Sequence, residues 1–170
     1  MAETRKAKPE PIEEPESIKT ALERAAKTDI DPDLRISLLV SGGAPSQRYR
    51  LDFAASGSGQ VKADYRCDMS DRRGKAKARK LERAQFAALA RAILASGLLE
   101  TPAEVPRFVP DTVVGVLELS RGLSAQRWYF AADPEQARAQ GAQPPPGLAK
   151  AADAVYAVAG RLVGKRSIKP

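Results

Sequence analysis

Three segments near the start of the chain alternate apolar and polar residues, and this period of two narrows the choice of fold more than any other pattern in the sequence. Residues 34–40 are apolar at every second position, and residues 49–53 and 61–69 follow the same pattern. Such alternation is typical of a β-strand with one buried face and one face in water. The sequence SGSG at 56–59 is a turn signal between the second and third segments. We therefore expect three consecutive strands, the last two forming a hairpin.

The rest of the chain adds two helices and a second hairpin. Apolar residues recur at helical spacing between residues 86 and 94, and Gly97 follows where a left-handed C-cap belongs. Residues 112–120 and 125–131 have the pattern of paired strands, and a last helix is predicted to begin after three prolines and to end at Gly164. The predicted order is βββαββα. This is an α+β fold, in which a mostly antiparallel five-stranded sheet has two helices on one face.

The charge divides the chain into an acidic tail and a basic body. Residues 1–33 hold nine acids and six bases, whereas residues 34–170 hold 12 acids and 22 bases. The opening stretch is rich in Pro and Glu and has almost no apolar residues to bury, so we expect it to be disordered. A short amphipathic helix is predicted between residues 17 and 27. The predicted division is a disordered tail with a short helix at 1–33 and a single basic domain at 34–170.

The composition excludes several kinds of active site. The chain has no histidine, so the usual zinc ligands and the Ser–His and Cys–His nucleophile pairs are absent. Cys67 is the only cysteine, which excludes an intramolecular disulfide, and we interpret it as a small buried hydrophobe. The N-terminal residues are polar, and no stretch approaches membrane-spanning length. We expect a cytoplasmic protein without a cofactor, a metal or a membrane contact.

Carboxylate and serine–lysine chemistry need no histidine, so their candidates require separate consideration. Asp64 and Asp68 lie on one face of a predicted strand, about 13 Å apart, which exceeds the roughly 5–9.5 Å between glycosidase carboxylates. We interpret them as ion-pair partners of Lys62 and Arg66. The serines of the SGSG turn lack the G-x-S-x-G order of a nucleophile elbow. The sequence therefore predicts that the chain is not an enzyme.

A basic run at residues 72–83 is the strongest polar anomaly, because it holds seven bases and one acid, Glu82. Each base could neutralise a phosphate of a nucleic acid. The alternative is a solvated entry to the following helix, with the acidic tail as an intramolecular counter-charge. No aromatic residue interleaves the run, which favours the alternative. The candidate residues are Arg72, Arg73, Lys75, Lys77, Arg79, Lys80 and Arg83.

An aromatic cluster at residues 127–130 holds three of the nine aromatic residues. Alternation places Trp128 and Phe130 on one face of a strand, which we interpret as core, and Tyr129 on the other face, at the surface. A base-stacking platform is the alternative, but the RNA-recognition signature is missing.

The order of several short motifs resembles the emfourin family, over roughly residues 34–164. Emfourins are small bacterial proteins known as inhibitors of thermolysin-like zinc metallopeptidases. The motifs are a first strand ending in Ser41, Gly42 and Gly43, a helix ending in Gly97, Leu98 and Leu99, the sequence RFVPD at 107–111 before a hairpin, and PPGL at 145–148.

The resemblance implies that loops such as residues 41–46 contact the partner, with Ser41, Gly42 and Gly43 as the candidate residues. The chain departs from the family in its acidic tail, in the extended charged strand at 60–69 and in the basic run. A true relative could therefore share the fold and bind another target.

Three functional hypotheses remain open at this point. The leading one is a non-enzymatic protein-binding domain of the emfourin type, whose partner is then a metallopeptidase. The second is nucleic-acid binding through the basic run. The third is a subunit of a larger assembly, in which the acidic tail and the basic run serve in docking.

Overall fold

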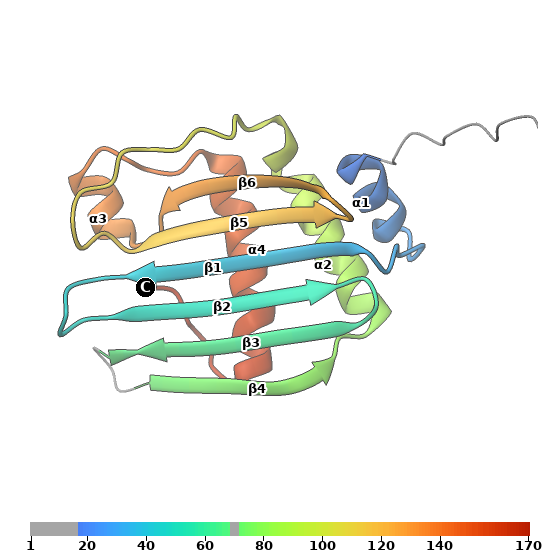
Figure 1. The fold of residues 1–170 in the computed structure, drawn as a ribbon, viewed down its shortest axis with the longest axis horizontal. Helices are drawn as coiled ribbons and strands as arrows, with labels where there is room; N and C mark the ends of the chain where they lie inside the picture. Colours follow the sequence, from blue (N-terminus) through green and yellow to red (C-terminus); the bar gives the residue numbers. More distant parts are fainter. Residues whose placement is uncertain (1–16, 69–71) are drawn as a thin grey trace, which may run out of the picture.

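The computed structural model describes residues 17–68 and 72–170, with the backbone alone for residues 72–79. The described strands form one antiparallel sheet in the order β4-β3-β2-β1-β5-β6 (Figure 1). The strands are β1 (Leu34–Gly42), β2 (Tyr49–Ser56), β3 (Gln60–Cys67), β4 (Arg72–Lys80), β5 (Val114–Arg121) and β6 (Ser124–Ala131).

Helices α2 (Arg83–Ser96) and α4 (Pro146–Val163) lie behind the sheet in Figure 1 and run across its strands. Both end at the glycines that the sequence indicated, because Gly97 and Gly164 adopt the left-handed conformation with φ of 79° and 70°. The helices are α1 (Ile18–Ala26), α2 (Arg83–Ser96), α3 (Pro134–Ala139) and α4 (Pro146–Val163), with a 3₁₀ turn η2 (Leu98–Glu100). No helix of the described residues is both long enough and apolar enough to cross a membrane.

The predicted α+β class is confirmed, and the five expected strands form an antiparallel arrangement with helices on one face. The strand count needs one correction. Residues 72–80, predicted as the entry to a helix, form a sixth strand, β4, which pairs with β3. Without β4, the backbone groups along that edge of β3 would lack strand partners. The helix itself begins only at Arg83.

The short helix α3 was missed by the sequence analysis. Asp133 caps it, since its carboxylate accepts from the backbone N–H of Glu135 at 2.8 Å, and Pro134 occupies the first turn. An N-cap aspartate followed by proline is a helix-start signal, but six residues are too few for a readable apolar period.

The core lies between the sheet and the helices, and α1 is part of it. Ala21, Leu22 and Ala25 are fully buried, and the Arg91 guanidinium of α2 donates to the Ala26 carbonyl at 2.7 Å. The predicted division at residue 33 therefore separates residues that share one core. The predicted disorder of residues 1–16 lies outside the described residues.

The pattern of inward and outward residues agrees with the sequence analysis at the aromatic cluster. Trp128 and Phe130 are buried, whereas Tyr129 is half-exposed on the opposite face. Phe130 needs the glycine across from it, because a Cβ at Gly115 would lie 2.3 Å from its ring.

Cys67 is a free thiol at the end of β3, and it is only partly buried.

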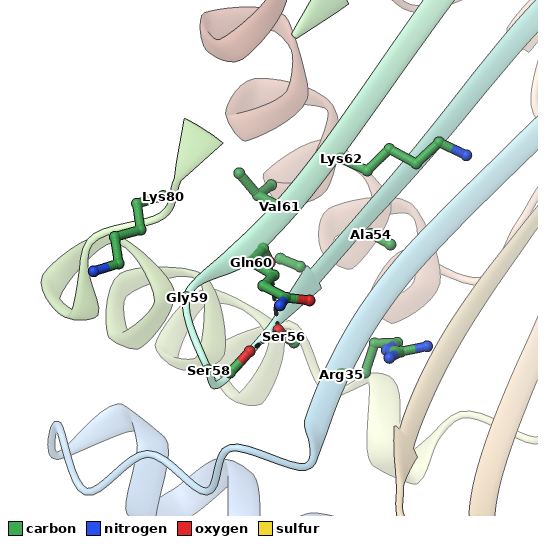
Figure 2. Close-up of a pocket in the computed structure, with 10 residues that line it drawn as sticks. Arg35, Ala54, Ser56, Ser58, Gly59, Gln60, Val61, Lys62 and Lys80 are labelled. Carbon is green, nitrogen blue, oxygen red and sulfur yellow. Dashed lines mark hydrogen bonds between the residues drawn. The ribbon is translucent and has the colours of Figure 1, made fainter. Parts of the chain in front are cut away.

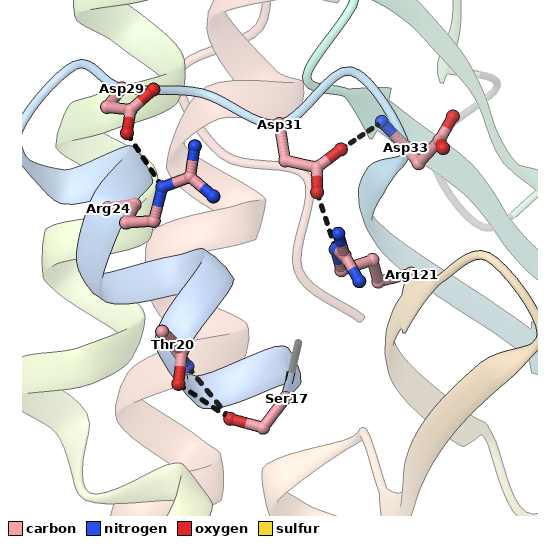
Figure 3. A network of polar contacts seen from close by, with 7 residues as sticks. All are labelled: Ser17, Thr20, Arg24, Asp29, Asp31, Asp33 and Arg121. Atoms are coloured by element: carbon pink, nitrogen blue, oxygen red, sulfur yellow. Dashed lines mark hydrogen bonds and ion pairs between the residues drawn. The ribbon is translucent and has the colours of Figure 1, made fainter. Parts of the chain in front are cut away.

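A polar network fixes the connection between α1 and β1 (Figure 3). The Asp31 carboxylate accepts from the Arg121 guanidinium of β5 and from the backbone N–H of Asp33. A Cβ at Gly57, in the turn after β2, would lie 1.8 Å from the Asp31 carbonyl oxygen. The connection is therefore held against both β5 and the β2–β3 turn.

Candidate binding surface

The face of the sheet opposite the helices is uncovered by any described segment, as Figure 1 shows, and we call it the open face. Strand alternation places on it the polar residues of β1, β2, β3, β5 and β6. Its charged residues are Arg35, Arg50, Asp52, Lys62, Asp64, Arg66, Glu118 and Arg127.

Three apolar residues cross one half of the open face in a line that we call the apolar stripe. Leu39 of β1 lies opposite Val116 of β5, and Val116 lies opposite Tyr129 of β6. Leu39 has 44% of its surface exposed, although it lies near the middle of a central strand. Val116 and Tyr129 are partly exposed, and contiguous apolar residues that reach the surface are typical of contact surfaces.

An apolar hollow of about 250 Å³ adjoins the apolar stripe at Tyr129. Trp128 also lines it, and the Trp128 indole N–H donates to the Thr101 carbonyl at 2.9 Å. The other side is formed by Leu148 and by prolines of two connections, Pro102, Pro106, Pro144 and Pro145. Pro102 and Pro106 are far along the chain from Pro144 and Pro145, and only the fold brings the two pairs together.

A second, basic hollow of about 690 Å³ opens at the end of the β2–β3 hairpin (Figure 2). Arg35, Lys62 and Lys80 come to it from three different strands, and no acidic residue lines it. The Ser56 and Ser58 hydroxyl oxygens lie 2.6 Å apart within it. The two serines therefore act here as polar lining in a turn.

The predicted partner loop lies at the other end of the same strands. Ser41 is exposed, and it shares a hollow of about 300 Å³ with Gly42, Gly43 and the arginines at 48, 50 and 66. The two glycines have local reasons to be there. Their φ angles are 136° and 95°, and a Cβ would lie 2.3 Å from the Thr112 carbonyl oxygen at Gly42 and 2.4 Å from that of Gln47 at Gly43.

The basic run lies along the edge of the sheet instead of at a helix entry. Arg72, Arg73, Lys75, Lys77, Arg79 and Lys80 belong to β4, and Arg83 is the first residue of α2. A signal for this strand is present in the sequence, since bases alternate with Gly and Ala over residues 73–79. We missed it because the period of two appears in charge and not in hydrophobicity.

The charges of the open face are mixed, because acids accompany most of its bases. Asp52 pairs with Lys62 and Glu118 with Arg127, while Arg66 pairs with Asp68 at 2.7 Å. The predicted partner of Asp68 is thus confirmed, whereas Lys62 bonds to Asp52 on the neighbouring strand. The hydrogen bond to Glu118 raises the pKa of Arg127. The unbalanced positive charge of the sequence is concentrated in β4.

The fold brings together one carboxylate pair that sequence spacing could not reveal. Asp52 and Asp64 lie directly opposite each other on β2 and β3. Neither residue lines any of the three hollows described above. Within residues 17–68 and 72–170, no three Cys, Asp or Glu side chains gather in a way that could hold a metal ion.

No protein-family model matches this sequence, and a search among curated proteins found no significant match. The resemblance to the emfourin family therefore stays a prediction that depends on its short motifs. Function must be inferred from the open face and its surroundings.

Proposed function

We propose that this chain is a protein-binding domain that acts without catalysis and contacts its partner through the open face. The exposure of Leu39 in the middle of a sheet is the observation that carries this proposal. Full burial of an exposed leucine side chain is worth about 1.5–3 kcal/mol, so a partner that covers the exposed part of Leu39 gains a fraction of that affinity. Val116 and Tyr129 extend the same contact toward the apolar hollow.

The composition of the open face suits a protein interface. An apolar centre with a polar, charged rim is the usual arrangement of such interfaces. Six strands about 4.8 Å apart, each about eight residues long, give a face of roughly 24 by 26 Å. Its area, roughly 620 Å², lies below the roughly 800 Å² that each partner buries in an interface of standard size, so adjoining surface would have to complete the contact.

Nucleic-acid binding is the second candidate, and the basic edge at β4 is the observation that favours it. The open face itself favours a protein, because Asp52 and Glu118 neutralise Lys62 and Arg127 on it. Tyr129 is also the one aromatic side chain that the described strands place on this face, and stacking platforms generally use several.

The resemblance to emfourins makes a thermolysin-like metallopeptidase the first partner to test. The loop that the resemblance implicates begins at Ser41, on the same strand and the same face as Leu39. A peptidase that contacts this loop would therefore also reach the apolar stripe. A cytoplasmic location and the absence of a cofactor belong to the same proposal.

The test measures inhibition of a panel of thermolysin-like peptidases by the purified protein at micromolar concentration. We expect inhibition by the wild type and at least about a tenfold loss with Leu39→Glu, because a carboxylate would be buried in the contact. Leu123→Glu is the matched control, since Leu123 is fully exposed at the tip of the β5–β6 turn.

Three outcomes would contradict the proposal at different levels. If every peptidase stays fully active, the inhibitor version is wrong. A partner captured from cell extract that is lost on nuclease treatment would contradict the claim that the chain binds a protein. A partner that Leu39→Glu and the wild type retain equally would contradict the claim that the contact is made through the open face.

A further inference from the structure

β4 is the outermost strand of the described sheet, and it pairs only with β3. Residues 72–76 follow a regular register, from Arg72 opposite Cys67 to Ala76 opposite Ala63. The register then shifts next to Lys62, as in a β-bulge. An outer strand has a second row of backbone N–H and C=O groups, and these can pair with another extended chain.

The sequence of β4 restricts which chain can pair there. Residues 72–80 hold six bases and no acid. A second copy of β4 would bring like charges opposite each other, which destabilises a strand pair. The bases thus disfavour pairing between the β4 strands of two copies of the chain. An acidic strand, in contrast, would be attracted to the same bases.

The register also predicts where the acids of such a strand belong. Arg73 lies opposite Arg66 and Lys75 opposite Asp64, so both hold open-face positions. Gly74, between them, lies opposite the buried Tyr65. Over the regular part of the register, a strand with acids at every second residue can therefore place two of them beside Arg73 and Lys75 on the open face.

We propose that β4 binds an extended acidic segment of a partner protein as a seventh strand, with an acid at every second position. This inference rests on the proposed protein-binding function and adds the kind of segment that the edge recognises. β4 is three strand spacings from β1, about 14 Å. One partner could therefore cover the apolar stripe and extend to this edge.

The test uses the full chain and capped eight-residue peptides, with affinity measured by fluorescence anisotropy. We expect an alternating Glu-Val peptide to bind, and to bind more weakly as salt is added. A peptide with the same composition, but with four Glu followed by four Val, should bind at least about tenfold more weakly. Equal affinity of the two peptides would overturn strand pairing, because simple attraction of charges needs no alternation.

Backbone methylation gives a second test that leaves the protein unchanged. In a strand, only alternate residues direct their N–H groups toward a given neighbour. Two versions of the alternating peptide, N-methylated on the Glu residues or on the Val residues, should thus differ by at least about tenfold in affinity. Equal affinity of the two versions would overturn the proposal.

A charge reversal in β4 tests whether the acidic peptide binds at this strand. The double variant Arg73→Glu with Lys75→Glu should no longer bind the acidic peptide, and it should bind an alternating Lys-Val peptide instead. The control is Lys19→Glu with Lys27→Glu, which should still bind the acidic peptide. Lys19 is an exposed residue of α1, and Lys27 is an exposed residue that directly follows this helix. Leu39→Glu should also keep it. A Leu39→Glu chain that loses the acidic peptide would place that contact on the open face and overturn strand addition, while the proposed function would stand.

Discussion

Two buried tyrosines differ in what their hydroxyl groups contact. The Tyr49 hydroxyl donates to the carbonyl of Ile168 near the C-terminus. The Tyr156 hydroxyl, on α4, is buried and has no hydrogen-bond partner in the described part of the chain. Burial raises the pKa of both hydroxyl groups, so both stay protonated at neutral pH.

We predict opposite effects when each of these hydroxyl groups is removed. Tyr49→Phe leaves the Ile168 carbonyl without its donor, and it should lower the free energy of unfolding by about 1 kcal/mol or more. Tyr156→Phe removes an unsatisfied polar atom and should be neutral or stabilising. Urea denaturation of the two variants, each a control for the other, measures the difference. Equal destabilisation by both would contradict the assigned contacts.

Helix α1 shows that an element can have too weak a pattern for its role to be read from the sequence. Its apolar spacing predicted a short helix, and Ser17 caps it by accepting from the backbone N–H of Thr20 at 3.2 Å. The spacing did not reveal that Leu22 is as fully buried as the residues of the central strands. The packing of α1 against α2 therefore makes it part of the domain.

A substitution in α1 tests this conclusion. Leu22→Ala should lower the free energy of unfolding by about 2–5 kcal/mol, because it leaves a cavity in the core. Glu23→Ala, on the exposed side of the same helix, should change it by less than about 0.5 kcal/mol. If Leu22→Ala unfolds at the same urea concentration as the wild type, α1 is not part of the core.

The part-buried ion pair between Asp31 and Arg121 links the connection after α1 to the sheet. Burial raises the pKa of Asp31, but hydrogen bonds from Arg121 and from the Asp33 N–H lower it by more, so it lies below its usual 3.8. A carboxyl group with a lowered pKa stabilises the fold above its unfolded pKa. This stabilisation is lost as the pH falls through the folded pKa.

We therefore predict that Asp31→Asn is less stable than the wild type by about 1–3 kcal/mol at neutral pH. The difference should stay constant down to about pH 4 and shrink below it, because the wild-type carboxylate becomes protonated there. Asp29→Asn removes the exposed pair with Arg24 and should have a much smaller effect. A difference that persists unchanged at pH 2 would show that the charge of Asp31 is not its source.

Elements whose patterns are local could be predicted from the sequence. Alternation in β1, β2 and β3 and the left-handed glycines after α2 and α4 require only near neighbours along the chain, so the α+β class could be predicted. The inward side of Trp128 and Phe130 followed from the same period. Ser41 and Gly42 are the last two residues of β1, and Gly43 follows the strand.

How distant segments combine depends on contacts that form only in the folded chain. Whether residues 72–80 continue a sheet or start a helix depends on the unpaired edge of β3, which no local pattern reveals. The apolar stripe exists because the register aligns Leu39, Val116 and Tyr129 from three strands. Register and packing set which side chains become neighbours, so the surface proposed to bind the partner could not be read from the sequence alone.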